Sequence, residues 1–171
     1  MTSMAFGRRE LMHGGGALAA LGAIGLLASG NNAADAAEAS NPAYETLLTR
    51  YATAVNAHDT STFPQLFTEA YIQHSGRSPS GLAAQIANYQ RIFENWPDFQ
   101  THIDDLIIGG DKIVAPATLS GTHGRTVLGF PPTGKRVTWR TIDIWRIENG
   151  KFAEHWDIVD LAALQKQLRG E

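Results

Sequence analysis

Residues 136–160 constrain the fold more than any other part of this chain. Side chains alternate in character over 136–147, the period-two pattern that is typical of a strand half buried in a sheet. A turn sequence, Glu-Asn-Gly, follows at 148–150, and a second strand-like segment runs over 151–159. The pattern therefore predicts an antiparallel hairpin.

The length of the turn decides which side chains of the hairpin share a face. A two-residue turn would place Ile142 opposite Asp157, so that Asp143 points to the other face. A three-residue loop, with its glycine in a left-handed bulge, would place Asp143 opposite His155 instead. We favour the three-residue loop because it collects aromatic and polar side chains on one face, as in a ligand pocket. These side chains are Trp139, Thr141, Asp143, Trp145, His155 and Asp157.

Residues 1–39 are not expected to belong to the folded domain. Arg8 and Arg9 precede a weakly hydrophobic run at 14–28 and then small-residue cleavage sites. This is the order of a secretory signal peptide, and the paired arginines resemble a twin-arginine export signal. An uncleaved membrane anchor is the alternative, but about fifteen apolar residues are short for a span of roughly twenty. We expect an exported, periplasmic or secreted domain at 40–171, with no stable membrane insertion after cleavage.

Composition excludes several classes of function. The chain has 14 basic and 17 acidic side chains, a net charge of −3, without the concentrated basic face that nucleic-acid binding needs. The charge pattern therefore predicts no nucleic-acid partner. The chain also contains no cysteine, which excludes disulfides and thiolate chemistry. The length of the mature segment suffices for one domain with a hydrophobic core.

The order of helical and strand patterns predicts the fold class. Helices are expected at 42–57, 62–67, 82–96 and after Asp160, and extended segments at 71–74, 99–108, 112–122 and in the hairpin. Helices first and strands afterwards indicate an α+β fold rather than an alternating α/β fold. We predict a cone-shaped α+β barrel, in which helices pack on a strongly curved antiparallel sheet and the mouth holds a small ligand.

Three segments carry a specific sequence signature. They are Gly-Phe-Pro-Pro-Thr-Gly-Lys at 129–135, Asp-Ile-Trp-Arg-Ile-Glu-Asn-Gly-Lys at 143–151 and Glu-His-Trp-Asp at 154–157. Over about 44–168 the chain resembles the SnoaL-like polyketide and ester cyclases of the nuclear-transport-factor-2-like superfamily. The resemblance implies a pocket between helices and sheet. It also implies an aspartate that acts as general acid and base in an intramolecular aldol closure, without metal or cofactor.

The resemblance carries over to individual residues. The catalytic aspartate falls on Asp157, while His123 and Tyr71 match residues near the pocket. The chain departs from the polyketide-cyclising branch at Asp143, where histidine is usual, and at His74, where histidine is not required. These departures argue against an aromatic-polyketide substrate more than against the acid/base chemistry. Export argues against that substrate as well, because polyketide intermediates are normally cytoplasmic.

The two aspartates of the hairpin have the chemistry that proton transfer requires. A carboxylate that removes a proton next to a carbonyl needs a pKa closer to the working pH than the usual ~3.9 of aspartate. Burial and a second carboxylate both raise the pKa, whereas a protonated His155 would lower it. Alternatively, Asp143 and His155 form a structural ion pair and Asp157 only caps a strand end.

A metal site is the other use of these side chains. His74, His123 and His155 with the aspartates would supply a two-histidine, one-carboxylate set. The sequence has no closely spaced ligand motif, so we expect neither metal nor cofactor. A histidine that donates a hydrogen bond to a substrate carbonyl is the more economical role.

The sequence leaves two functions of different classes. The first is a cyclase or isomerase acting on a small hydrophobic carbonyl compound, with Asp157 as acid and base and with His123 and Asp143 orienting the substrate oxygen. The second is an exported binding protein that uses the same pocket without turnover. The pocket would be lined by His74, Tyr71, Trp139, Trp145 and His155.

The opposite face of the hairpin predicts a contact between copies of the chain. It would carry an apolar patch beside an ion pair between Arg146 and Glu154. The patch comprises Arg140, Ile142, Ile144, Trp156 and Ile158. Because the superfamily often pairs through this face, the resemblance implies a homodimer.

Overall fold

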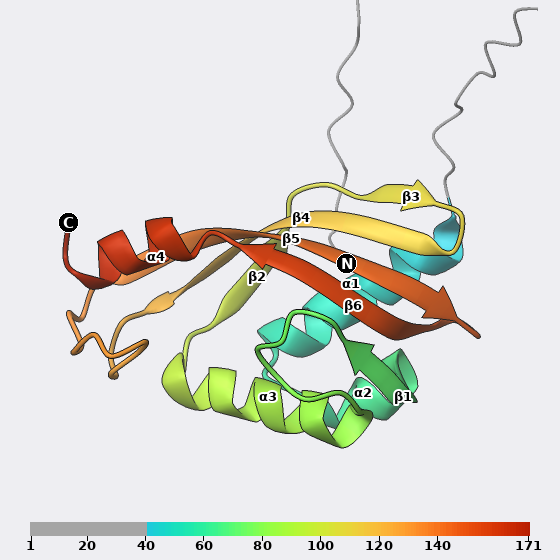
Figure 1. Ribbon diagram of the computed structural model, residues 1–171, viewed down its shortest axis with the longest axis horizontal. Coiled ribbons are helices and arrows are strands. Elements are labelled where there is room, and N and C mark those ends of the chain that lie inside the picture. The colour runs from blue at the N-terminus through green and yellow to red at the C-terminus, as the bar shows by residue number, and fades with distance from the viewer. Residues whose placement is uncertain (1–40) are drawn as a thin grey trace, which may run out of the picture. The chain divides into compact units, whose positions relative to one another are not determined.

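The computed structural model describes residues 41–171, so the predicted signal segment at 1–39 lies outside the described residues. The elements are α1 (Pro42–Asn56), η1 (Thr60–Thr62), α2 (Phe63–Leu66), β1 (Phe67–Gln73), α3 (Leu82–Asn95), β2 (Gln100–Ile103), β3 (Ile107–Gly109), β4 (Lys112–Thr122), β5 (Arg136–Glu148), β6 (Lys151–Val159) and α4 (Leu161–Leu168) (Figure 1). The predicted α+β class is confirmed. None of the helices in this part of the chain is long and apolar enough to cross a membrane.

The six strands form one open sheet in the order β1-β6-β5-β4-β2, with β3 also paired to β4. Since β1 and β2 stand at opposite ends of this order, the sheet is not closed, and it is not strongly curled either. The predicted cone-shaped barrel with a strongly curved sheet is therefore wrong. The helices provide the physical reason, because their side chains share one hydrophobic core with the inner face of the sheet and occupy the space that closure would need.

The sheet is also not purely antiparallel. β1 runs parallel to β6, and Gln73 lies beside His155 in this pairing. The two strands are separated by most of the domain, so no tight turn imposes an antiparallel direction on them. This pairing places the end of β1 and the loop that follows it next to β6.

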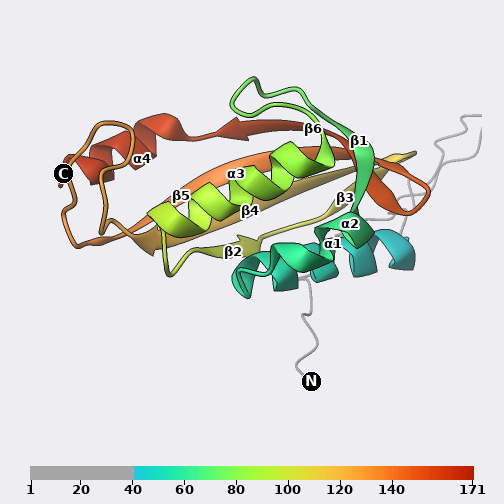
Figure 2. The ribbon, with the colours of Figure 1, turned by 90° about the horizontal axis from the view of Figure 1, so that it is seen from below.

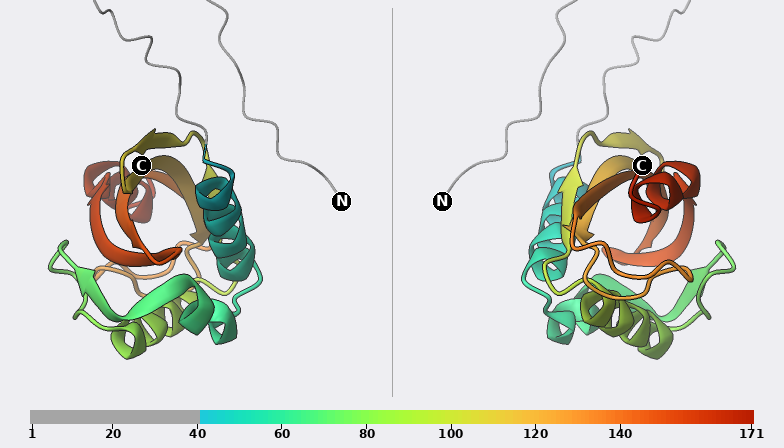
Figure 3. Two further views of the ribbon diagram at one scale, coloured as in Figure 1. Left: turned by 90° about the vertical axis from the view of Figure 1, so that its right-hand side faces the viewer. Right: turned by 90° about the vertical axis from the view of Figure 1, so that its left-hand side faces the viewer.

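Helices α1, α2 and α3 lie on the same side of the sheet (Figures 2 and 3). α1 begins where the Asn41 side chain accepts a hydrogen bond from the Ala43 backbone N–H at 3.1 Å, with proline in the first turn. Its buried face carries Tyr51, whose ring contacts the rings of Tyr89 on α3 and Trp145 on β5. These contacts fix both helices against the sheet.

The hairpin of β5 and β6 has neither of the two predicted registers. Asn149 and Gly150 both have positive φ and form a two-residue turn that pairs Glu148 with Lys151, so the three-residue loop is wrong. One extra residue, Ala153, then enters β6 as a bulge, and the register shifts between positions 146 and 147.

The bulge determines which side chains share the inner face. Beyond it, Asp143 pairs with Asp157 and Trp145 pairs with His155. One extra residue reverses the facing of a strand, so the expected side chains still share a face. The observed register differs by one residue from the two-residue prediction and by two residues from the three-residue prediction. Phe152 remains in the core before the bulge.

Gly121 on β4 packs closely against Trp96, the residue that follows α3. A Cβ atom at this position would lie 2.9 Å from Cε3 of the buried Trp96. We predict that Gly121→Ala lowers the free energy of unfolding by about 1–3 kcal/mol, because a methyl group forces the indole to move. Chemical denaturation measures this.

Gly109→Ala on β3 is the matched control, since no atom lies within 4 Å of its Cβ position. The control should change stability by no more than about 0.5 kcal/mol. Equal losses in the two variants would show that the contact with Trp96 is not the cause.

Candidate active site

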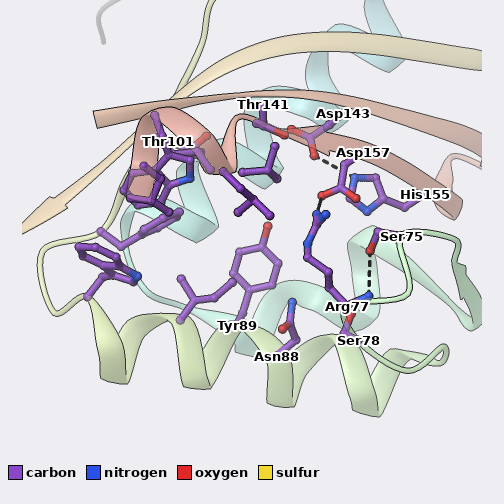
Figure 4. Close-up of a pocket in the computed structure, with 18 of the residues that line it drawn as sticks. Ser75, Arg77, Ser78, Asn88, Tyr89, Thr101, Thr141, Asp143, His155 and Asp157 are labelled. Atoms are coloured by element: carbon purple, nitrogen blue, oxygen red, sulfur yellow. Dashed lines mark hydrogen bonds and ion pairs between the residues drawn. The ribbon is translucent and has the colours of Figure 1, made fainter. Parts of the chain in front are cut away.

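A cavity of about 310 Å³ lies between α3 and the inner face of the sheet (Figure 4). Its volume falls at the lower end of the ~300–1,000 Å³ range of small-molecule sites. Most of its wall is apolar, and Trp96 packs against Trp139 with ring centroids 5.1 Å apart. Other apolar wall residues are Phe99, Ile103, Leu119, Val127 and Leu164. A ligand of this cavity would therefore have a mainly apolar body.

Two carboxylates face each other at the polar side of the cavity. Asp143 on β5 and Asp157 on β6 are direct cross-strand partners, and their side chains are 13% and 8% exposed. Like charges that are directly opposite in a sheet are destabilising, so this arrangement needs compensating partners. His155 and Arg77 supply them.

His155 links Asp143 to β1 through both of its ring nitrogens. The Gln73 side-chain oxygen accepts a hydrogen bond from the Ser75 backbone N–H at 3.2 Å, which orients the amide. The Gln73 amide nitrogen therefore donates to Nδ1 of His155 at 3.0 Å, so Nδ1 carries no hydrogen. Nε2 then carries the hydrogen and donates it to Oδ1 of Asp143 at 2.9 Å. His155 is thus a neutral imidazole in this network.

Asp157 has one occupied and one open carboxylate oxygen. The Arg77 guanidinium donates to Oδ2 (Figure 4). Oδ1 is buried and has no hydrogen-bond partner within residues 41–171. A buried acceptor without a partner is costly, and in a ligand cavity it is free to accept a hydrogen bond or a proton from a ligand.

The hydroxyl groups of Tyr51 and Tyr89 form a hydrogen-bonded pair, and both residues line the cavity. Burial raises the pKa of both hydroxyls, and the charge of Asp143 raises them further. Both groups therefore stay protonated across the physiological pH range. One of the two protons is used between the rings, so the other can be donated to a ligand oxygen.

The structure brings four of the predicted site residues together at the cavity, namely Trp139, Asp143, His155 and Asp157. Trp145 and Tyr71 are buried beside them and contact the His155 ring, with centroids 5.0 and 6.5 Å away. They support His155 and are not part of the cavity lining.

His123 and His74 lie away from the cavity lining. His123 is fully buried at the base of the 123–135 loop, where its Nδ1 lies 3.1 Å from Oγ1 of Thr133. It reaches the cavity only through the ring of Trp96, 6.1 Å away. His74 faces outward, stacked on Trp156 at 4.3 Å and bonded to Glu154 at 2.8 Å. Strand alternation explains this, because its neighbour Gln73 faces inward. The catalytic and binding roles of all the predicted residues stay predictions.

Four residues of the site have no signal in the sequence pattern, namely Arg77, Gln73, Tyr51 and Tyr89. Arg77 stands in the Gly/Ser/Pro-rich segment after β1, which gives no signal for the direction of a side chain. The tyrosines sit at apolar positions of amphipathic helices and therefore read as core. Only the pairing of β1 with β6 brings Gln73 to His155.

Asp143, His155 and Asp157 also form a group whose ligand-type atoms lie within 4.8 Å of one another. The tautomer of His155 does not suit a metal, because Nε2 carries a hydrogen and has no lone pair to offer. A metal-bound histidine usually donates its second ring N–H to an acceptor, whereas Nδ1 here accepts from Gln73. The hydrogen bonds fit proton transfer better than metal binding.

The fold and this site define an α+β domain with a small-ligand cavity and paired carboxylates. The family model of the SnoaL-like polyketide cyclases matches residues 45–168. The chain belongs to this family.

Two curated relatives have names that state a reaction. Aklanonic acid methyl ester cyclase DnrD of Streptomyces peucetius is 28% identical over 94 residues, which cover 54% of this chain and 62% of DnrD. DauD of Streptomyces sp. (strain C5), which bears the same enzyme name, is 28% identical over 94 residues, 54% of this chain and 56% of DauD. The match spans about three fifths of the length of these relatives.

Solved structures agree on the fold. TsrD from Streptomyces laurentii superposes with a TM-score of 0.70 at 32% identity, covering 75% of this chain and 96% of TsrD. A SnoaL-like polyketide cyclase from Agrobacterium tumefaciens strain C58 superposes with a TM-score of 0.66 at 19% identity. The match covers 72% of this chain and 96% of the Agrobacterium chain. The second likeness shows the fold alone.

The hydrogen bonds around His155 give a direct prediction. Nitrogen-15 NMR of the histidine side chains should show His155 with a hydrogen on Nε2 and none on Nδ1 at neutral pH. In Gln73→Glu an acceptor replaces the donor, so both nitrogens should carry hydrogen. The resonances of His123, which bonds elsewhere, serve as the control. A hydrogen on Nδ1 in the parent protein would contradict the network.

Proposed function

We propose that this domain catalyses acid/base chemistry on a small, mainly apolar carbonyl compound, without a cofactor. The observation that carries the proposal is Oδ1 of Asp157, an acceptor without a partner in residues 41–171 that is buried beside a second carboxylate in an apolar cavity. Such an oxygen can take a proton from a carbon next to a carbonyl group.

The site contains groups for each step of this chemistry. Asp157 takes the α-proton, the C–H electron pair becomes the enolate double bond, and the carbonyl oxygen gains the charge. The free proton of the Tyr51–Tyr89 pair is available to that oxygen. In ring closure the α-carbon then attacks a second carbonyl of the same molecule. The new alkoxide receives the proton from Asp157, so acid and base are restored.

The relatives support a ring-closing reaction within this chemistry. DnrD and DauD are named as cyclases of aklanonic acid methyl ester. We propose a cyclase or isomerase reaction of the same type on a smaller ketone or ester, in keeping with the cavity volume of about 310 Å³. Proton removal comes first in either reaction.

Hydrogen exchange tests the proton-removal step without the natural substrate. With propiophenone in D₂O, NMR should show deuterium entering the α-position faster with the protein than without it. Asp157→Asn should slow the protein-dependent exchange by at least about a hundredfold, because the base is lost. Its affinity for the ketone should stay within a few-fold.

Asp111→Asn, which removes an exposed carboxylate next to Lys112, is the control and should exchange at the parental rate. An Asp157→Asn variant that keeps its activity would refute the role of the base. Affinity and rate falling together would also refute it.

A second function, ligand binding without turnover, is favoured by the Arg77–Asp157 pair. This pair occupies one oxygen of the proposed base and gives the cavity an internal ion pair. If the parent binds the ketone and exchanges it no faster than Asp157→Asn does, the domain is a binding protein.

We also propose that the domain acts after export and that its outer sheet face joins two copies. Export rests on the arginine pair and apolar run of residues 8–39. On the outer face Ile142 pairs directly with Ile158, and these side chains are 47% and 76% exposed. The predicted ion pair of Arg146 and Glu154 is confirmed further along the same two strands, with Nε and Oε1 2.6 Å apart.

Light scattering tests the dimer. At micromolar concentration the mass should equal two chains, and Ile158→Lys should reduce it to one, since a charge would be buried in the interface. Ile158→Val keeps the surface apolar and should stay dimeric. A parent protein with the mass of one chain would contradict the proposal.

A further inference from the structure

We infer that Arg77 binds the negatively charged oxygen of the reacting ligand, so that the cavity selects enolates and enolate-like anions. The inference deepens the proposed function and rests on it for the nature of the reaction. It concerns a separate property, the preference of the cavity for an anion, which can be measured without turnover.

Arg77 is the only lysine or arginine among the described residues that line the cavity. Its guanidinium extends from the segment between β1 and α3 to Asp157 at the polar side (Figure 4). The Arg77 side chain is 45% exposed, whereas that of Asp157 is 8% exposed. The cation therefore lies where a ligand that enters the cavity meets the base.

The segment that carries Arg77 is fixed at both ends. The Gln73 backbone N–H donates to Oγ of Ser80 at 3.0 Å, and the Gly81 N–H donates to the Tyr71 carbonyl at 2.6 Å. The guanidinium has five N–H donors, and Asp157 is its only hydrogen-bond partner within residues 41–171. The other donors remain for a second acceptor, so a ligand oxygen can bind with little movement of the backbone.

The charges of the site account for the role of Arg77. In the resting site the Asp157 carboxylate and the Arg77 guanidinium form a pair, and a neutral ketone enters. When the α-proton passes to Asp157, that carboxyl becomes neutral and the charge moves to the ligand oxygen. Arg77 then pairs with the ligand oxygen, so the cation has an anionic partner before and after the transfer. Because His155 is neutral in this network, no other cation of the described cavity lining can take this role.

The alternative is that Arg77 only neutralises Asp157 or closes the cavity. The two roles differ in their effect on ligand selectivity. A neutralising or closing residue affects charged and neutral ligands alike, whereas an oxyanion-binding residue affects only the anion.

Two matched probes separate these roles. 2-Hydroxy-1,4-naphthoquinone is an enolate-type anion at neutral pH, and its 2-methoxy ether is neutral with a similar shape. Calorimetry with both probes should show that Arg77→Gln weakens binding of the anion by about ten- to a hundredfold, the size of a lost charge-assisted hydrogen bond. Binding of the ether should stay within about twofold, which also shows that the variant is folded.

Three further variants sharpen the test. Asp157→Asn mimics the protonated acid and should bind the anion about tenfold more tightly, because no carboxylate competes for Arg77. Arg77→Lys keeps the charge without the planar fork and should fall between parent and Arg77→Gln. Arg50→Gln removes an exposed arginine that bonds Gln65, and should leave both affinities unchanged.

An anion-to-ether affinity ratio that is unchanged in Arg77→Gln would overturn the inference, as would a weaker anion complex of Asp157→Asn. The α-exchange assay distinguishes a failure of this inference from a failure of the proposed reaction. If the parent shows no α-exchange but Arg77 sets the ratio, the reaction is wrong and the anion site stands. If Asp157 drives exchange and the ratio is unchanged, only the Arg77 inference fails.

Discussion

The repulsion between two carboxylates on neighbouring strands is the constraint on which the site depends. Asp143 and Asp157 are direct partners in the sheet and both are largely buried. Two different groups compensate for them: a neutral imidazole donates one hydrogen bond to Asp143, and a guanidinium pairs with Asp157. The unequal partners leave one buried oxygen of Asp157 open, and the proposed chemistry uses that oxygen.

The parallel strand at the edge of the sheet positions both of these partners. By pairing with β6, β1 brings Gln73 to His155 and starts the segment that carries Arg77 over Asp157. A hydrogen bond from the Ser75 backbone to Gln73 fixes the amide, which in turn fixes the tautomer of His155. The electrostatics of the site therefore follow from sheet topology and from one short loop.

The bulge at Ala153 allows β6 to contribute side chains both to the core and to the site. The Asn149-Gly150 turn sets the first pairs of the hairpin, and Phe152 packs in the core against Trp145. One extra residue then shifts the register, so that His155 and Asp157 face the cavity. Bulges are frequent beside active sites because they redirect side chains without disturbing the rest of the sheet.

The sequence by itself determined the α+β class, most of the element boundaries and the family. It also favoured a shared face for Asp143, His155 and Asp157, but through a three-residue loop that the chain does not form. These follow from local periodicity and from residues that are close along the chain. Only the tertiary structure decided the open sheet, the parallel pairing of β1, the bulge and the approach of Arg77 to Asp157. The open sheet, the pairing of β1 and the Arg77 contact depend on segments that are far apart in the sequence. The bulge depends on how one extra residue fits the packing of the core. Local sequence patterns carry no information about either.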